Sequence, residues 1–357
     1  MKKIDLILLA TIIFLTIFGF FMIYDASSYV AFRDFSDKYH YVKDQLAWLI
    51  LGMFGLISFS YFDYHKLYNL SLPLLFSAIV MLILVFIPGI GVGLLGAHRW
   101  INLKAFVLQP AEFVKMVLAI YLSAWFSKKE KGRLLAFLLL LGLVLSLVLI
   151  EPDMGTSLVI LCEALVIYFL SGSNIFYFAA LLPAIAFIGI FLIKISAYRA
   201  KRLEAFLSIN QSIESSSYHV KQILIALGSG GIFGVGIGKS IQKYAYLPEA
   251  TTDSIFAIIA EELGFIGATF VIFLFAVIAW RGFSIAINAK DNFGKLLAAG
   301  ITTFISVQAI INLGAITSLF PLTGIPLPFI SYGGSSLIVD LCSIGILLNI
   351  SKSASSH

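Results

Sequence analysis

Apolar runs long enough to cross a bilayer recur along this sequence, and they constrain its fold more than any other feature. A helix of about 20 apolar residues spans the hydrocarbon core of a membrane. Only 12% of the residues are charged, whereas a soluble domain carries about 25%. The sequence therefore predicts an all-α polytopic membrane protein of about ten transmembrane helices, at residues 5–24, 45–61, 69–88, 108–126, 134–150, 157–171, 176–198, 254–279, 297–319 and 334–350.

Three further properties exclude other classes of protein. Cys162 and Cys342 both lie in apolar segments, so the sequence indicates neither a disulfide framework nor a metal cluster. The net charge of +5 is small for 357 residues and is explained by basic loops beside a membrane rather than by nucleic-acid binding. The first apolar run, residues 6–24, has no small-residue cleavage site after it, and we interpret it as a retained span.

The distribution of lysine and arginine predicts that both termini face the cytoplasm. With the N-terminus inside, the short inner loops hold eleven of these residues and the short outer loops hold five. Residues 199–253 would form a large outer loop that holds six more and cancels this margin, but long translocated loops respond weakly to charge. We expect one transmembrane domain over residues 1–357, with the large outer loop at 199–253 and a C-terminal tail at 351–357.

Two segments on the predicted outer side are unusual for loops. Residues 199–253 contain the glycine-rich run GSGGIFGVGIGKS, and residues 320–333 contain three prolines. Long loops inside compact proteins are usually functional. The glycine-rich run lacks the spacing GxxxxGKS or GxxxxGKT of a nucleotide-binding loop. In a membrane protein such segments more often form half-inserted helices or tight turns that line a cavity.

Residues 244–264, YAYLPEATTDSIFAIIAEELG, run from a polar loop directly into an apolar helix. Thr251 or Thr252 can cap the first turn, and Asp253 lies at or beside the helix start. A carboxylate at that place is stabilised by unpaired backbone N–H groups and by the positive end of the helix dipole. Asp253 is therefore either a helix cap or a functional acid, and the local sequence does not separate the two.

Ionisable residues also occur where a membrane makes them costly. Glu112 and Lys115 lie three residues apart near a predicted helix start, so they share one face. They form either a surface ion pair or part of a polar cavity, and we favour the cavity because Lys115 falls inside an apolar span. Glu163 and Asp340 are isolated charges in apolar spans and are expected to face the interior of the bundle.

Basic residues are concentrated in the predicted outer loop that precedes Asp253. They are Arg199, Lys201, Arg202, Lys239 and Lys243. Basic groups at a membrane surface pair with lipid headgroups, but arginine and lysine also bind phosphate. The turn at residues 151–157, EPDMGTS, is likewise either a hydrated loop or a functional one. The residues alone leave these alternatives open.

Five strings occur in an order that resembles one family. They are RWINL, QPAEFVKM, EPDMGTS, the block from YHVKQILIALGSGG to TTDSIFAIIAEELGFIG, and LTGIPLPFISYGGSSL, and they cover nearly the whole chain. In these strings the chain resembles the SEDS family (shape, elongation, division and sporulation), whose FtsW, RodA and SpoVE branches are polytopic bacterial cell-wall polymerases. The run GIGKSIQKYAYLPEATTD favours the division-type FtsW branch over RodA.

The resemblance implies a peptidoglycan glycosyltransferase of the bacterial cytoplasmic membrane, which polymerises lipid II at the outer face in cell division or elongation. Asp253 matches the family's essential acid and would act as the general base. The substrate-binding residues expected from the resemblance and from the basic loop are Trp100, Glu112, Lys115, Arg199, Arg202, Lys239, Lys243 and Glu249. The chain departs from the family's frequent pattern at Thr251 and Ser254, which replace His and Phe, and at Glu151, which replaces Gln or Lys.

Lipid II carries an α-linked sugar diphosphate and the product is β-linked, so one inverting displacement suffices. That reaction needs a base at the acceptor hydroxyl and positive charge at the departing diphosphate. No metal-ligand spacing is evident, and a Mg²⁺ or Mn²⁺ ion would be shared with the diphosphate oxygens. The implied partners are a class B penicillin-binding protein and other divisome or elongasome membrane proteins, without nucleic acid. Two other functions stay open: a lipid II flippase, and a non-catalytic scaffold that recruits the penicillin-binding protein.

Overall fold

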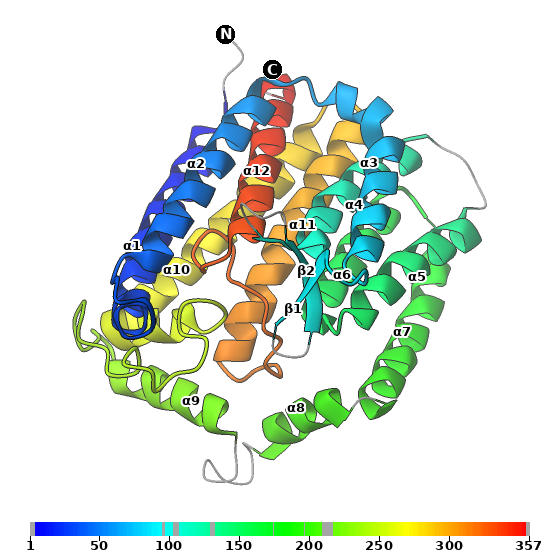
Figure 1. The fold of residues 1–357 in the computed structure, drawn as a ribbon. Helices are drawn as coiled ribbons and strands as arrows, with labels where there is room; N and C mark the ends of the chain where they lie inside the picture. The colour runs from blue at the N-terminus through cyan, green and yellow to red at the C-terminus, as the bar shows by residue number, and fades with distance from the viewer. Residues whose placement is uncertain are drawn as a thin grey trace.

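The computed structural model describes residues 4–94, 97–102, 107–128, 133–173, 175–195, 197–208 and 217–354. Most of these residues are helical (Figure 1). The helices are α1 (Leu6–Phe35), α2 (His40–Tyr61), α3 (His65–Leu84), α4 (Pro110–Phe126), α5 (Leu134–Ile150), α6 (Met154–Leu170), α7 (Ile175–Ile195), α8 (Ala197–Ser208), α9 (Tyr218–Gly230), α10 (Ile255–Asn288), α11 (Asn292–Ile316) and α12 (Gly334–Ala354). The strands are β1 (Gly91–Leu94), β2 (Ala97–Asn102) and β3 (Val107–Leu108).

Each of the ten predicted spans corresponds to one helix, namely α1 to α7 and α10 to α12, so the predicted polytopic all-α fold is confirmed. Within the described residues, α1, α2, α3, α10, α11 and α12 are long and apolar enough to cross a membrane. Helices α5 and α6 are also apolar but have only 17 residues each. The helices pack side by side as a bundle, with α7 at its edge (Figure 1).

The centre of the bundle is formed by α11 and α12. Their most apolar windows are 83% and 78% buried, against 17% for α2 and 28% for α3 and α10. The outer helices turn large apolar side chains such as Phe54 and Phe76 away from the bundle. In a bilayer this exposure costs little, because lipid tails are as apolar as the side chains. Polar residues are instead found in the bundle interior, where a site can be built.

A small antiparallel sheet joins α3 to α4, and it was not predicted from the sequence. Strand β1 pairs with β2, and β2 pairs with β3, with Ile101 opposite Gly91 on one side and Leu108 on the other. The register of β1 and β2 shifts between Val92 and Gly93. Frequent glycines in residues 89–96 obscure the alternation by which a strand is recognised from sequence.

The described residues of segment 199–253 are largely folded. Helix α8 begins at Ala197 and α9 ends at Gly230, and a series of tight turns leads from there to α10. Helices α8 and α9 lie at the end of the molecule opposite the N- and C-termini (Figure 1). Helices α8 and α9 therefore lie at one end of the bundle and the termini at the other.

The glycine-rich run is fastened to a break in α10. The helix is interrupted at Gly264, which has φ 68° and ψ −167°. A break of this kind frees backbone groups that need new partners inside a membrane. The run supplies them through four hydrogen bonds, from Val235 N to Glu261 O (3.0 Å), from Gly236 N to Glu262 O (3.0 Å), from Phe265 N to Gly231 O (2.9 Å) and from Ile266 N to Ile232 O (3.2 Å). The run therefore forms tight turns packed against α10.

We expect Gly264→Ala to destabilise the protein. A Cβ atom at Gly264 would lie 2.3 Å from Gly234 N and 2.5 Å from Ile232 O, and the positive φ disfavours any L side chain. The strained backbone alone costs about 1–3 kcal/mol. Thermal unfolding in detergent measures the loss. Gly142→Ala, in a helix with open space around the glycine, is the control and should unfold at or slightly above the wild-type temperature. Equal unfolding temperatures for the two variants would contradict the packing described here.

Candidate active site

Asp253 lies in the turn that immediately precedes α10, two residues before the candidate membrane span that begins at Ile255. The N-cap residue of α10 is Ser254, and this helix start has no side-chain capping hydrogen bond. The structure therefore does not use Asp253 as a side-chain cap. Its partly buried carboxylate accepts a long hydrogen bond of 3.5 Å from Thr252 Oγ1.

The surroundings of Asp253 raise the pKa of its carboxyl group. Burial raises the pKa of Asp253 to about 7, the nearby Glu249 carboxylate acts in the same direction, and Arg202 opposes both. An exposed aspartate has a pKa of about 3.9 and is a weak base. A general base is most effective when its pKa lies near the operating pH. Burial thus brings the pKa of Asp253 into the range in which a carboxylate can act as a general base.

Arg202, on α8, lies beside Asp253 across Gly324. A Cβ atom added to Gly324 would be 3.7 Å from Asp253 Oδ2 and 3.8 Å from Arg202 Nη2, so both side chains border the same glycine. Arg202 is held there by a hydrogen bond of 2.8 Å from its Nη1 to Leu322 O. The structure therefore brings together an acid and a guanidinium that lie about 50 residues apart in the sequence. Arg199, one turn earlier on α8, donates to Leu149 O at 3.2 Å.

The proline-containing segment 320–333 holds the turn that carries Asp253. Tyr332 N donates to Thr251 O at 2.8 Å, and Ser331 Oγ donates to Thr252 O at 2.5 Å. The amide of Asn312, on α11, donates both to Asp253 O at 2.8 Å and to Ile325 O at 2.9 Å. These contacts bind the segments 199–253 and 320–333 to each other, with Asp253 at their junction.

Glu249 is part of the turn that carries Asp253 and accepts several of its hydrogen bonds. Its backbone has a positive φ of 50°. Its carbonyl accepts from Thr252 N at 3.2 Å and from Ser254 N at 3.1 Å, and its Oε2 accepts from Thr252 Oγ1 at 2.9 Å. Glu249 was predicted to bind substrate. The structure places its carboxylate near enough to Asp253 to raise the pKa of that residue.

The two lysines of the basic loop occupy different settings. Lys239 is exposed, and its side chain lies along Gly236, whose Cβ atom would be 3.3 Å from Lys239 Cδ. Lys243 is buried and pairs with Asp25 and Glu262 at 2.8 and 3.1 Å. Lys243 was expected among the substrate-binding residues, from the resemblance and from the basic loop. In the structure its ammonium forms ion pairs with two carboxylates of the protein itself.

Glu112 and Lys115 form a buried ion pair of 2.8 Å on α4. Their side chains are 2% and 1% exposed, so the alternative of a surface ion pair is wrong. Lys115 also donates to Gln308 Oε1 and lies 5.6 Å from the centre of the Phe304 ring. Glu163 and Asp340 are fully buried, as predicted, and lie close enough to Lys115 for an electrostatic interaction with its ammonium. Together with Glu112 and Lys115 they form a buried polar centre.

Two side-chain amides of α11 connect this buried centre to the Asp253 turn, and neither was predicted from the sequence. Gln308 accepts from Lys115 and donates from Nε2 to Pro326 O at 3.0 Å. Asn312 lies one turn further along and bonds Ile325 O and Asp253 O. Residues four apart share a helix face. The spacing of these two amides in an otherwise apolar span was therefore the sequence feature that could have predicted a polar face on α11.

Trp100 lies on β2, paired with Val92, and is half-buried. The adjacent Arg99 fixes the hairpin to the turn between α5 and α6, since it donates to Glu151 O at 2.9 Å and to Pro152 O at 2.5 Å. Burial raises the pKa of Glu151 to about 8, with Asp153 adding to the shift and Arg99 opposing it.

Asp153 has a structural role in that turn. Its Oδ1 accepts from Thr156 N at 3.0 Å and caps α6, and its Oδ2 accepts from Gln109 Nε2 at 3.1 Å. The EPDMGTS string therefore includes a helix cap that also ties α6 to the start of α4.

Residues 5–356 match the family described as "Cell cycle protein", FTSW_RODA_SPOVE. The chain belongs to this family. A relative from Trichlorobacter lovleyi named "Probable peptidoglycan glycosyltransferase FtsW" is 41% identical over 97% of this chain and 93% of its own length. Stage V sporulation protein E of Bacillus subtilis is 40% identical over 97% of this chain and 96% of its own length. The resemblance drawn from the five strings is thus confirmed, and FtsW-named proteins recur among the relatives.

Two solved structures share the fold of this chain. The crystal structure of the Rod shape determining protein RodA of Thermus thermophilus superposes with a TM-score of 0.73, with 25% identity and 99% of each chain covered. A chain from a peptidoglycan synthase complex superposes with a TM-score of 0.81, with 24% identity and 100% of each chain covered. The second likeness concerns the fold alone.

Proposed function

We propose that this protein is a peptidoglycan glycosyltransferase that polymerises lipid II into glycan strands, with Asp253 as the general base. The observation that carries the proposal is the position of Asp253: a partly buried carboxylate with a pKa of about 7, next to Arg202, in a turn outside the spans. Relatives that bear the name peptidoglycan glycosyltransferase cover nearly all of the chain. The family and the geometry of the turn therefore support the same chemistry.

In the proposed reaction the Asp253 carboxylate removes the proton of the 4-hydroxyl of the acceptor sugar. The hydroxyl oxygen forms a bond to the anomeric carbon of the donor. The bond between that carbon and the diphosphate oxygen breaks, and its electron pair leaves with the diphosphate. Attack from the face opposite the leaving group converts the α-linkage into a β-linkage. The guanidinium of Arg202, with Arg199 on the same face of α8, would stabilise the departing diphosphate.

A divalent cation would rely on the substrate for much of its coordination. Among the residues described, no group of three or more His, Cys, Asp and Glu side chains is arranged to hold a metal ion. Mg²⁺ keeps several waters and is commonly bound through substrate phosphates together with one or two carboxylates. A Mg²⁺ or Mn²⁺ ion that takes part would therefore be shared with the diphosphate of lipid II.

We place the protein in the bacterial cytoplasmic membrane with both termini in the cytoplasm and the Asp253 turn outside. The lysine and arginine content of the short loops supports this orientation. The position of α8 and α9 opposite the termini agrees with it (Figure 1). The undecaprenyl tail of lipid II would then lie between the spans. The buried Glu112–Lys115 centre would lie deeper along the same substrate path.

We propose a class B penicillin-binding protein as partner, within the divisome or elongasome. The support is that a structure with the same fold belongs to a peptidoglycan synthase complex.

Reconstitution with purified lipid II tests the proposed function and separates it from a flippase. The protein is placed in liposomes with and without its penicillin-binding partner, whose transpeptidase is blocked, and glycan strands are resolved on a gel. We expect a ladder of strands. Movement of fluorescent lipid II between leaflets without any polymer would support a flippase instead. Neither polymer nor movement, in the presence of the partner, would support a scaffold.

A further inference from the structure

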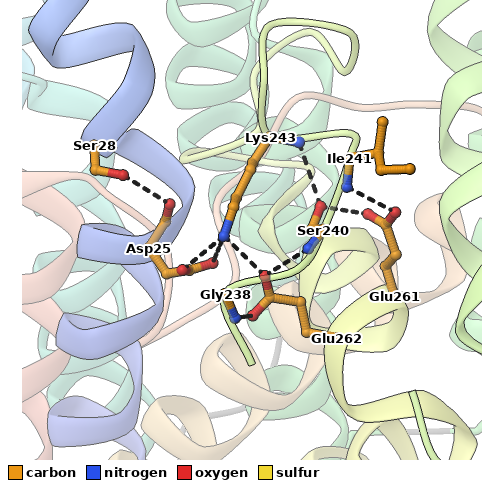
Figure 2. Close-up of polar contacts among 8 residues, drawn as sticks. All are labelled: Asp25, Ser28, Gly238, Ser240, Ile241, Lys243, Glu261 and Glu262. Atoms are coloured by element: carbon orange, nitrogen blue, oxygen red, sulfur yellow. Dashed lines mark hydrogen bonds and ion pairs between the residues drawn. The ribbon is translucent and has the colours of Figure 1, made fainter. Parts of the chain in front are cut away.

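Lys243 belongs to the loop that leads to Asp253. Its side chain lies in a cluster of charged groups between α1 and α10 (Figure 2). Its ammonium is 2.8 and 3.0 Å from the two carboxylate oxygens of Asp25, on α1, and 3.1 Å from Glu262 Oε1, on α10. Lys243 itself is 5% exposed. Two carboxylates face this one ammonium, so the positive charge of Lys243 is already paired within the protein.

On the α10 side of this cluster, the carboxylates of α10 bind the backbone of loop residues 238–241. The neighbouring carboxylates of Glu261 and Glu262 accept from three loop N–H groups and one hydroxyl (Figure 2). These donors are Gly238 N (3.0 Å) and Ser240 N (3.1 Å) to Glu262, and Ile241 N (3.1 Å) and Ser240 Oγ to Glu261. Hydrogen bonds from backbone N–H groups to ionised carboxylates are among the stronger ones in proteins. Residues 238–241 are therefore fixed to α10.

The α1 side is held by Lys243. Its ion pair with Asp25 connects the loop to α1, and one turn further along α1 the Tyr29 ring meets the Tyr244 ring edge-on, 5.1 Å between centres. An ammonium bound by carboxylates from two different helices acts as a cross-link between them. The loop is thus held between α1 and α10 at Lys243, ten residues before Asp253.

The chain from Lys243 to Asp253 is a sequence of tight turns rather than a slack linker. Leu247 N donates to Gln242 O at 3.0 Å, and Ser254 N donates to Glu249 O at 3.1 Å. Leu247 is buried in the bundle core. Because the segment is short and internally bonded, we expect a displacement at Lys243 to reach Asp253.

We propose that Asp25 and Lys243 form a positioning clamp, which fixes the Asp253 turn between α1 and α10 and acts on catalysis through Asp253 without touching substrate. This inference rests on the proposed function. It replaces the predicted role of Lys243 as a ligand of the diphosphate. A misplacement of about 1 Å at a catalytic group can lower a rate about 100-fold, so loss of the clamp should reduce kcat while leaving KM nearly unchanged.

The test compares Asp25→Asn with Lys243→Met in the full-length protein, assayed on lipid II in liposomes. We expect each variant to lower kcat about 10- to 100-fold, with KM within about twofold of wild type. The double variant should be no worse than the single ones, because both remove one interaction. Asp25→Glu, which keeps the ion pair, should restore most of the rate. Asp34→Asn is the matched control, since it removes the same charge from an exposed pair with Arg33 at the end of α1.

Hydrogen exchange of residues 238–247 supplies a readout that does not depend on activity. We expect faster exchange there in Asp25→Asn and wild-type exchange in Asp34→Asn. A raised KM in Lys243→Met together with full activity in Asp25→Asn would overturn the clamp and return Lys243 to the substrate. Unchanged exchange in Asp25→Asn would also overturn it. If the wild-type protein makes no glycan, the proposed function fails, and the exchange measurement still decides on the clamp.

Discussion

Asp253→Asn is expected to lower the rate of glycan-strand synthesis by about 10²- to 10⁴-fold, the usual contribution of a general base. Asparagine has nearly the shape of aspartic acid but cannot accept the proton of the acceptor hydroxyl. It also resembles the protonated carboxyl group that burial favours at Asp253, whose pKa is raised to about 7. The variant should therefore keep its fold and its thermal stability while it loses activity.

Initial rates of strand formation from lipid II, measured beside thermal unfolding, check this expectation. Asp37→Asn is a suitable control, because Asp37 lies in the exposed turn after α1, where it pairs with Lys43 at 2.7 Å. That variant should polymerise lipid II at the wild-type rate. If Asp253→Asn were equally active, Asp253 would have no part in the chemistry.

Lys115→Met should produce the largest loss of stability. Lys115 is 1% exposed and is bound by Glu112 at 2.8 Å, with further bonding to Gln308. Removing one partner of a buried ion pair leaves an uncompensated charge and costs about 3–5 kcal/mol. Glu163 and Asp340 add to the cost, since their carboxyl groups also lose the nearby cation. Thermal unfolding in detergent should show a clear fall in midpoint.

A second variant separates the charge effect from loss of packing. In the double variant Glu112→Gln, Lys115→Met neither partner is charged, so the protein should be more stable than Lys115→Met alone. Arg33→Met, which breaks an exposed pair with Asp34, should leave the midpoint unchanged. A Lys115→Met protein that unfolds at the wild-type temperature would show that the buried pair contributes little.

The helices could be predicted from sequence because lipid imposes one simple rule, a long apolar run for each span. Helix α5 has the predicted bounds, residues 134–150. Helices α1 and α10 extend to Phe35 and Asn288, well past their predicted ends. Hydropathy falls where the chain leaves the membrane, but backbone hydrogen bonding continues into the polar residues beyond. The sequence pattern marks the span and not the whole helix.

The contacts of the site could be predicted only in part. Asp253 was identified through the family resemblance, and its position beside Arg202 depends on Gly324 in a third segment. The partners of Lys243 lie 218 and 19 residues away, so no local pattern distinguishes a clamped lysine from a phosphate-binding one. The break at Gly264 is equally a matter of tertiary packing, since the glycine-rich run satisfies the backbone that the break exposes.

The pH dependence of lipid II polymerisation tests most directly whether Asp253 acts as the base. Only the ionised carboxylate can take a proton, and burial sets its pKa at about 7. The rate is measured at saturating lipid II. We predict that the wild-type rate rises about tenfold per pH unit at acidic pH and levels off above about pH 7. A rate that is constant from about pH 5 to about pH 9, or that falls as pH rises through 7, would contradict a proton transfer to Asp253.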